Sequence, residues 1–580
     1  MSEQLAAKRH TLAHLLAAAI QEMYPNAKPT IGPAIDNGFY YDFDFGGNAP
    51  GEDDLKKIEK KMRELLPSWK EFEHEVKSAD EARSAFEGNE YKTELIDDLD
   101  KNGDTITFYS CGKFTDLCRG GHSEHPNKDI PKDSFTLDRI AGAYWRGDEK
   151  KSMLTRIYGL AFDTKEELDA YLAQRAEAEK RDHRKLGAEL DLFHFDESIG
   201  KGLPIWLPKG TIIKEELENW AKETERAWGY QRVTTPIITK EDLFYTSGHL
   251  PLYKDSMYAP IQIEDENYYI KPMNCPFHHR AFAARPKSYR DLPLRYAEYG
   301  WCHRYEDSGS LFGLMRVRGM QMNDAHIYVR KEDAVEEFVR VIKLHEYYYQ
   351  TLGIKEYEME LALRDPKKMD KYHGDEDDWK DAERMTIEAM EKSGVPYKIV
   401  NEGAAFYGPK MDFQITSSIG RSFTASTNQL DLYMGKRFGL SYTDSDGQEK
   451  VPAIIHRAPL GTHERFIGFL IEHFGGAFPL WLSPVQIMVL PVSEKHSEYA
   501  RTVTEQLHTA NIRVELNEAD SLGKRIRNAK MQKVPYFLVV GDEEVANNTA
   551  TLEARAGKVG AFAIAEIVAK LTEEIRTKAA

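Results

Sequence analysis

The stretch Cys302-His303-Arg304-Tyr305-Glu306, followed after a short loop by Arg316-Val317-Arg318-Gly319, decides how this sequence is interpreted. It continues a strand-like run at Leu294–Cys302, so Arg304 stands beside apolar strand residues. Arg465 has a similar setting in a helix-like segment that follows Gly461. An isolated arginine in such a place requires a carboxylate or a phosphate that matches its planar fork. Internal ion pairs are the alternative interpretation for both arginines.

Three possible metal ligands lie around these arginines in the sequence: Cys275, His326 and His456. Each one ends or follows a strand-like run, so one sheet could bring the three together. A thiolate and two imidazoles leave a tetrahedral zinc ion with one open position, which is typical of a catalytic rather than a structural site. Three unrelated core or surface residues are the alternative.

Composition narrows the class of protein. The chain has 580 residues, enough for about four domains, and its four cysteines exclude a disulfide scaffold. A net charge of −17 argues against a generic DNA-coating protein. From Leu482 onward, 13 basic and 13 acidic residues give a net charge of zero, so the whole net charge of −17 lies in the first 481 residues. The basic segment Lys524–Lys530 in this neutral tail permits RNA binding, although a solvated helix face is the simpler interpretation.

Neither a membrane span nor an export signal is expected. No apolar run reaches about 18 residues, and Met1–Arg9 is polar and lacks the core of a signal peptide. A cytoplasmic protein is therefore the expectation.

The pattern of elements predicts four parts, at residues 1–163, 164–200, 201–480 and 481–580. The first combines helices at Thr11–Ile20 and Glu52–Lys77 with strand-like stretches, which predicts an α+β domain. Thr164–Leu190 is expected to be one connecting helix. The third part mixes strands and long helices without a P-loop or a Rossmann turn. In the fourth, strands alternate with helices, which predicts an α/β domain with a mainly parallel sheet.

The motifs resemble those of class II aminoacyl-tRNA synthetases. Arg304-x-Glu306, the loop and Arg316 resemble motif 2, Gly461-x-x-x-Arg465 resembles motif 3, and Pro236 resembles the motif 1 proline at the dimer interface. Longer stretches resemble the threonyl-tRNA synthetase family in particular: Tyr253–Met257, Lys271–Pro276, Leu314–Gly319, Asp324–His326 and Tyr407–Lys410. The resemblance implies an antiparallel class II catalytic sheet between an N-terminal editing domain and a C-terminal anticodon-binding domain. It also implies a homodimer.

The resemblance implies roles for the residues of an ATP site. Arg304 would hold the α-phosphate and the threonine carboxylate, and Glu306 would accept from the adenine amino group. Arg316 and Arg465 would grip the terminal phosphates together with Mg²⁺, and Gln429 would belong to the same pocket. Such a site works by positioning and electrostatics.

Amino-acid recognition would centre on one zinc ion per subunit held by the Cys275, His326 and His456 set. Threonine could present its amino group and its hydroxyl to the metal, whereas valine lacks the hydroxyl. Asp324 would accept from that hydroxyl and Tyr407 would face the amino group. His249 and Lys410 match residues that assist transfer of threonine to tRNA(Thr).

Serine also carries a hydroxyl, and losing one methyl group gives only about 1–3 kcal/mol of discrimination, so an editing site is expected. His10 and His14 share one helix face, and with Cys118 and His122 they resemble the family's hydrolytic editing pocket for seryl-tRNA(Thr). Further matches to this pocket are Lys92 and Asp116. A bound zinc ion is the alternative for these four nitrogen and sulfur groups.

The C-terminal domain would bind the anticodon, with Glu544 and Arg555 as candidate base contacts. The sequence departs from the family pattern at Phe277, Met322 and Thr424. We expect it to start at the editing domain, without the small ubiquitin-like domain that commonly precedes it. Other hypotheses are a class II synthetase for another amino acid, a non-catalytic RNA-binding paralogue, and a free-standing deacylase.

Overall fold

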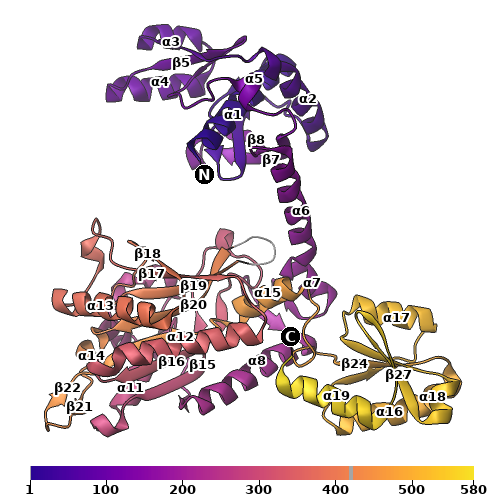
Figure 1. Cartoon of the computed structure of the whole chain (residues 1–580). Helices are drawn as coiled ribbons and strands as arrows, with labels where there is room; N and C mark the ends of the chain where they lie inside the picture. The colour runs from indigo at the N-terminus through magenta and orange to yellow at the C-terminus, as the bar shows by residue number, and fades with distance from the viewer. Residues whose placement is uncertain (1, 417–421, 580) are drawn as a thin grey trace. The chain divides into compact units, whose positions relative to one another are not determined.

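The computed structural model describes residues 2–416 and 422–579, and the chain divides into two compact units, Met1–Ala176 and Glu177–Ala580 (Figure 1). Each unit has its own hydrophobic core. Among the described residues, none of the helices combines the length and the apolar character that crossing a bilayer requires.

The first unit is α+β, as predicted. Helix α1 (Glu3–Met23) begins at Ser2, whose hydroxyl accepts from the Leu5 amide at 3.2 Å. A five-stranded antiparallel sheet has the order β1-β3-β8-β7, with β2 on β3. A smaller sheet has the order β4-β5-β6. The strand bounds are β1 Lys28–Pro29, β2 Ala34–Ile35, β3 Gly38–Asp44, β4 Glu73–Val76, β5 Thr107–Cys111, β6 Phe114–Leu117, β7 Phe135–Tyr144 and β8 Met153–Ala161.

Two helical predictions need correction. The helix predicted at Glu52–Lys77 is only α2 (Leu55–Leu65), because Pro67 follows and cannot continue a helix, and Glu73–Val76 is a strand. The connecting helix is two helices, α6 (Lys165–Arg181) and α7 (His183–Glu189). Asp182 separates them and caps α7 by accepting from the Arg184 amide at 2.8 Å. Residues 193–195 then form strand β9, so the predicted 164–200 segment is not helical throughout.

An eight-stranded sheet forms the centre of the second unit, in the order β11-β15-β16-β23-β20-β19-β17-β18. Only the outermost pairs, β11 with β15 and β17 with β18, are parallel. This confirms the antiparallel core that the motifs predicted. The strand bounds are β11 Gln231–Arg232, β15 Leu294–His303, β16 Gly319–Val329, β17 Tyr357–Ala362, β18 Tyr397–Val400, β19 Lys410–Thr416, β20 Ser422–Asp431 and β23 Ala453–Ala458.

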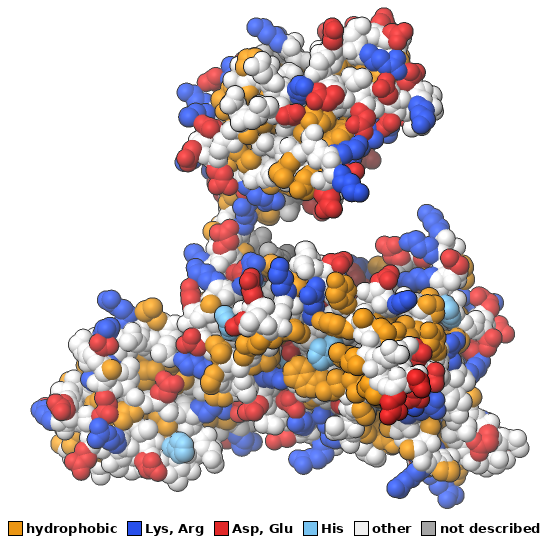
Figure 2. All heavy atoms as spheres, turned by 180° about the vertical axis from the view of Figure 1, so that it is seen from behind, with side chains coloured by type: hydrophobic (Ala, Val, Ile, Leu, Met, Phe, Trp, Pro, Cys, Tyr) orange, Lys and Arg blue, Asp and Glu red, His pale blue; other side chains and the backbone are white. Residues whose placement is uncertain are grey.

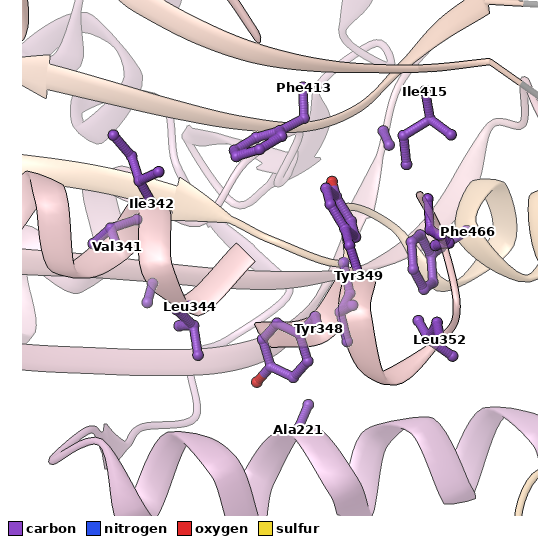
Figure 3. Packing of buried hydrophobic residues seen from close by; sticks show 14 of the residues in the cluster. Ala221, Val341, Ile342, Leu344, Tyr348, Tyr349, Leu352, Phe413, Ile415 and Phe466 are labelled. Carbon is purple, nitrogen blue, oxygen red and sulfur yellow. The ribbon is translucent and has the colours of Figure 1, made fainter. Parts of the chain in front are cut away.

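Helices pack against this sheet and bury its apolar side. In Figure 3, Tyr349 of α12 (Ala334–Thr351) points toward Phe413 of β19, and Tyr348 points toward Ala221 of α8 (Pro208–Ala227). The rings of Tyr349 and Phe413 lie 5.3 Å apart in an edge-on arrangement. The helices that carry site residues are α10 His249–Leu252, α11 Cys275–Ala283 and α15 His463–Phe474. A separate small sheet, β12-β14-β13, consists of Ile238–Lys240, Glu266–Ile270 and Ile261–Ile263.

The C-terminal part of the second unit contains a mixed sheet in the order β25-β24-β26-β27-β28. The prediction of a mainly parallel sheet holds for β24, β25 and β26 but is wrong for β27 and β28, which are antiparallel. The short link from Ala554 to Gly557 can join only antiparallel strands. The bounds are β24 Ile487–Pro491, α16 Ser497–Thr509, β25 Val514–Leu516, α17 Leu522–Met531, β26 Tyr536–Val540, α18 Asp542–Asn547, β27 Thr549–Ala554, β28 Gly557–Ala563 and α19 Ile564–Thr577.

Candidate active site and a second histidine cluster

A pocket of about 450 Å³ opens on the central sheet of the second unit. It is lined by most of the residues that the sequence singled out for ATP, threonine and metal: His249, Cys275, Arg304, Glu306, Asp324, Tyr407, Lys410, Gln429, His456 and Arg465. These residues come from segments as far apart as 249 and 465, and the antiparallel strands bring them to one place. Met322 and Thr424 also line this pocket.

Arg304 and Arg465 line the pocket, and Arg316 lies close enough for its charge to act on Arg465, although it is not among the lining residues. Arg304 donates its Nε to the Pro272 carbonyl at 3.1 Å, and Arg465 donates its Nε to the Met315 carbonyl at 3.2 Å. Arg316 donates to Glu306 Oε2 at 2.8 Å. Burial, followed by the nearby charges of Arg304 and Arg316, lowers the pKa of Arg465. Cations held this close to one another form a site for a polyanion.

The predicted metal set comes together on the sheet. His326 on β16 and His456 on β23 are directly paired across the two strands, and Cys275 is the first residue of α11. One donor atom from each of the three residues lies within 4.8 Å of the others. Burial and the nearby Asp324 carboxylate raise the pKa of the Cys275 thiol well above its ordinary value, so a thiolate there needs a cation.

The hydrogen bonds around the two histidines test whether this set suits a metal. Within the described part of the chain, His326 Nε2 and His456 Nδ1 are buried without a hydrogen-bond partner. Glu298 Oε2 lies 3.1 Å from His278 Nε2, and His278 Nδ1 lies 2.8 Å from His326 Nδ1. If the carboxylate accepts from His278 Nε2–H, then His278 Nδ1 must accept from His326 Nδ1–H. The lone pair of His326 is then on Nε2, the nitrogen without a partner.

Asp431 orients the second histidine in the same way. Its Oδ2 lies 2.9 Å from His456 Nε2, and its Oδ1 accepts from the amides of Tyr433 and Met434 at 2.8 Å each. The lone pair of His456 is therefore on Nδ1. Burial lowers the pKa of His326. Each of the two histidines keeps one ring nitrogen without a hydrogen-bond partner, which is what a metal ligand requires. The residues present therefore fit a zinc ion.

The other predicted residues lie around this set. Asp324 Oδ2 accepts from Asn274 Nδ2 at 3.0 Å, and Tyr407 donates to Gln429. Lys410 is paired with Asp412 at 2.7 Å. His249 Nδ1 lies 2.7 Å from Ser247 Oγ. Burial and the charge of Arg304 lower the pKa of His249 to about 3, so this imidazole is neutral at physiological pH.

The three departures from the family pattern differ in their consequences. Met322 and Thr424 line the pocket, so both can influence substrate contacts. Gln321, the residue before Met322, does not take its place, because its side-chain amide donates to the Tyr299 carbonyl at 3.0 Å. Phe277 is buried in a small apolar cluster with Phe244 and is not a lining residue of this pocket.

The first unit contains a second cluster, formed by His10, His14, Cys118 and His122. His10 Nε2 lies 3.2 Å from His14 Nε2 and 3.5 Å from Cys118 Sγ, and Cys118 Sγ lies 3.4 Å from His122 Nε2. One donor atom of each residue lies within 4.8 Å of the others, so this set can also surround a cation. The structure thus brings together the four residues that the sequence analysis grouped, and their role in editing stays a prediction.

A buried ion pair supports this cluster. Lys92 Nζ lies 2.5 Å from Asp116 Oδ1, and Asp116 Oδ2 accepts from the Tyr41 hydroxyl at 2.5 Å and lies 3.4 Å from His14 Nδ1. Burial lowers the pKa of His14 well below its ordinary value and, together with the neighbouring imidazoles, lowers that of His122 to about 2. Burial raises the pKa of Cys118 to about 11. The lowered pKa values keep His14 and His122 neutral at physiological pH, so each offers a nitrogen lone pair to a hydrogen-bond donor or a cation.

The candidate anticodon residues are already engaged within the chain. Glu544 accepts from the Gly541 amide at 2.9 Å and from the Thr551 hydroxyl at 2.7 Å. Arg555 donates to the carbonyls of Lys533 and Ala477, at 2.9 and 3.1 Å. Their contact with a base remains a prediction.

The residues that the sequence argument missed are those behind the metal set: His278, Glu298, Asp431 and Asn274. One signal was available, because His278 follows Cys275 by three positions and therefore lies on the same face of α11. Glu298 and Asp431 give no local signal, since only the sheet brings them to their histidines.

Comparison with known proteins agrees with this geometry. The family described as tRNA synthetase class II core domain (G, H, P, S and T) matches residues 258–474, and an anticodon binding domain matches residues 486–574. A threonine–tRNA ligase of Deinococcus radiodurans is 47% identical over 558 residues, which are 95% of this chain and 85% of that protein. A threonine–tRNA ligase of Thermus thermophilus is 46% identical over 591 residues, covering 98% and 88%.

A solved structure, described as the RNA binding domain of threonyl-tRNA synthetase from Cryptosporidium parvum, superposes with a TM-score of 0.65 and 35% identity. It covers 68% of this chain and 98% of that one. The relatives are 46–47% identical over nearly the full length of this chain. The two family matches follow in the order expected from the motifs, catalytic core first and anticodon-binding domain second. The chain therefore belongs to the threonine–tRNA ligases, a family of class II aminoacyl-tRNA synthetases.

Proposed function

We propose that the pocket of the second unit is where this threonine–tRNA ligase activates L-threonine with ATP and transfers it to tRNA(Thr). One observation carries the proposal: Arg304 and Arg465 line the same pocket as Cys275 and His456 of the Cys/His/His set, and Arg316 lies near Arg465. The arginines suit a triphosphate and a carboxylate, and the donor set suits an amino acid with a hydroxyl.

Arg304 holds the α-phosphate and the threonine carboxylate, so that a carboxylate oxygen attacks the α-phosphorus and pyrophosphate leaves. Arg316 and Arg465 hold the departing phosphates together with Mg²⁺, and Glu306 faces the adenine amino group. Catalysis then depends on holding two anions in line and on neutralising their charge.

Cys275, His326 and His456 hold one zinc ion per subunit in this proposal. When bound, it supplies a Lewis-acidic position open to the amino group and hydroxyl of threonine, which valine cannot fill in the same way. Asp324 accepts from the threonine hydroxyl, Tyr407 faces the amino group, and Gln429 orients Tyr407.

The transfer step uses His249 and Lys410. The neutral imidazole of His249 is able to accept the proton of the terminal ribose hydroxyl of tRNA(Thr) as that oxygen attacks the threonyl carbonyl and AMP leaves. Lys410 contributes positive charge near the transferred group.

Residues 1–163 form an editing domain that hydrolyses seryl-tRNA(Thr). His10, His14, Cys118 and His122 surround the ester, while Lys92 and Asp116 fix the polarity of the cluster. The support is chemical: a pocket that selects threonine by its hydroxyl cannot reject serine strongly, so a second, hydrolytic site is needed.

Residues 164–200 connect this domain to the catalytic domain, 201–480, and residues 481–580 bind the anticodon, with Glu544 and Arg555 as candidate contacts. The enzyme acts as a homodimer in the cytoplasm. Figure 2 shows hydrophobic side chains gathered on one face of the larger unit. In addition to Pro236, four apolar side chains that are 41–45% exposed are available for the dimer interface: Ile237, Ile238, Ile261 and Ile263.

The test is amino-acid-dependent exchange of pyrophosphate with ATP, measured with threonine, serine and valine on protein assayed for zinc. We expect strong exchange with threonine, weaker exchange with serine, none with valine, and about one zinc per chain. Full threonine exchange by a zinc-free Cys275→Ala variant would contradict the metal-based recognition. No exchange with any amino acid would favour a regulatory paralogue.

A further inference from the structure

We propose that His183 is a positioning residue for the ATP-dependent step: it holds the loop between β15 and β16 so that Arg316 is presented to the nucleotide. The inference rests on the proposed function, because it needs Arg316 to bind the terminal phosphates. His183 itself is completely buried and does not line the pocket.

Both ring nitrogens of His183 are used, and their partners come from different elements. His183 is the first residue of α7, and its Nδ1 lies 2.7 Å from Glu472 Oε1 of α15. The backbone amide of Leu314, in the loop, donates to His183 Nε2 at 3.1 Å. A backbone N–H can only donate, so Nε2 is the acceptor and the imidazole donates from Nδ1–H to the carboxylate.

Leu314 is the centre of a tight turn that ends at Arg316. The amide of Phe312 donates to the Arg316 carbonyl and the amide of Arg316 donates to the Phe312 carbonyl, each at 3.2 Å. A displacement of Leu314 therefore carries Arg316 with it. The guanidinium of Arg184, next to His183 on α7, lies 4.4 Å from the centre of the Phe312 ring and adds a second contact to the same turn.

Gly313 shows how closely the turn follows the imidazole. Its φ is +48°, and a Cβ at this position would lie 2.2 Å from His183 Nε2. Only a glycine permits the loop backbone to approach the ring in this way.

The turn held by His183 is directly linked to the arginines of the pocket. Arg465 donates to the Met315 carbonyl, and Arg316 donates to Glu306. Loosening the turn should therefore affect the grip on ATP while leaving the threonine side, around Cys275 and Asp324, unchanged.

A matched pair of substitutions separates the two hydrogen bonds. His183→Asn retains a donor near the position of Nδ1 but loses the acceptor for Leu314, whereas His183→Gln places an acceptor near the position of Nε2. In threonine-dependent pyrophosphate exchange, we expect His183→Asn to raise the KM for ATP about fivefold to tenfold, as for the loss of one hydrogen bond. The KM for threonine should change by less than about twofold, and His183→Gln should stay close to wild type.

Limited trypsin digestion gives a readout that does not depend on activity. Cleavage after Arg316 and Arg318 should be faster in His183→Asn than in His183→Gln. Gly313→Ala crowds the imidazole from the loop side, so it should also raise the KM for ATP and speed cleavage of the loop. It replaces His183→Asn in the test if that variant does not fold. His496→Asn is the stability control, because His496 is a buried histidine bound to Ser493 and Asp542, outside this loop.

Equal effects of the Asn and Gln variants, a parallel rise in the KM for threonine, or unchanged cleavage of the loop would each overturn the inference. Arg316→Ala distinguishes two failures: that Arg316 does not bind ATP as proposed, and that His183 does not position Arg316. If that variant leaves the KM for ATP unchanged, the role of Arg316 is wrong, and the digestion experiment alone then decides whether His183 holds the turn.

Discussion

At the scale of single residues, the metal ligands depend on partners that never touch the substrate. Glu298 fixes the tautomer of His278, which fixes that of His326, and all three are almost fully buried. Burial opposes ionisation of Glu298, but hydrogen bonds from His278 and Thr235 hold its pKa below the ordinary value. The carboxylate therefore stays charged at neutral pH and keeps the relay oriented.

His278→Ala should lower the affinity for zinc about 10-fold to 100-fold, because the partner that orients His326 is lost. The measurement is competition for zinc with a chelator of known affinity, on protein that retains its melting temperature. His496→Ala, a buried histidine of the C-terminal part of the chain, should leave the affinity unchanged. Unaltered zinc binding by His278→Ala would show that the relay does not orient the ligand.

At the scale of elements, α15 contains a buried carboxyl group that forms no salt bridge within the described part of the chain. Glu464 is completely inaccessible and accepts from the Gln321 amide at 3.0 Å. Burial raises its pKa from 4.5 to about 7. A raised carboxyl pKa contributes stability that is fully present below pH 4.5 and is lost as the pH rises through about 7.

Glu464→Gln should therefore raise the free energy of unfolding at about pH 8.5 by up to about 3 kcal/mol, and have little effect near pH 5. Urea unfolding at the two pH values is the measurement. Glu218→Gln is the matched control with the opposite sign, because His463 and Lys222 outweigh the effect of burial and lower the pKa of Glu218 to about 2. A gain for Glu464→Gln that is larger at pH 5 than at pH 8.5 would contradict the assignment.

The same scale shows why the sequence predicted some elements and not others. Leu294–Cys302 was predicted almost to its ends, because ten successive residues of β15 form a continuous, largely apolar strand. The break at Asp182 was missed because every neighbouring residue favours helix, and only the capping contact to Arg184 ends it. The β27–β28 hairpin was missed because a glycine-containing link of a few residues can also precede a helix.

The candidate site followed a similar rule. Cys275, His326 and His456 were predicted from residue type and motif, and the structure brings them together. The resemblance already placed Met322 where a glutamine of the family often contacts threonine, and the structure puts Met322 in the lining of the pocket. Which of Gln321 and Met322 faces the pocket depends on strand register. Glu298 and Asp431 depend on the pairing of distant strands, which no local pattern reports.

At the scale of the whole molecule, two units contain two separate histidine clusters, and this division predicts that activation and editing can be lost independently. His10→Ala combined with His14→Ala should leave threonine-dependent pyrophosphate exchange unchanged and slow the hydrolysis of seryl-tRNA(Thr) at least about 100-fold, because two of the four groups that surround the ester are removed. Deacylation of purified seryl-tRNA(Thr), measured beside pyrophosphate exchange, is the test.

The control is His125→Ala, because His125 is a partly exposed histidine of the same unit; this variant should change neither rate. If the double variant still hydrolysed seryl-tRNA(Thr) at the wild-type rate, the cluster would not be the editing site. If it lost threonine exchange as well, the two units would not act separately, and selection against serine would have to be sought in the second unit alone.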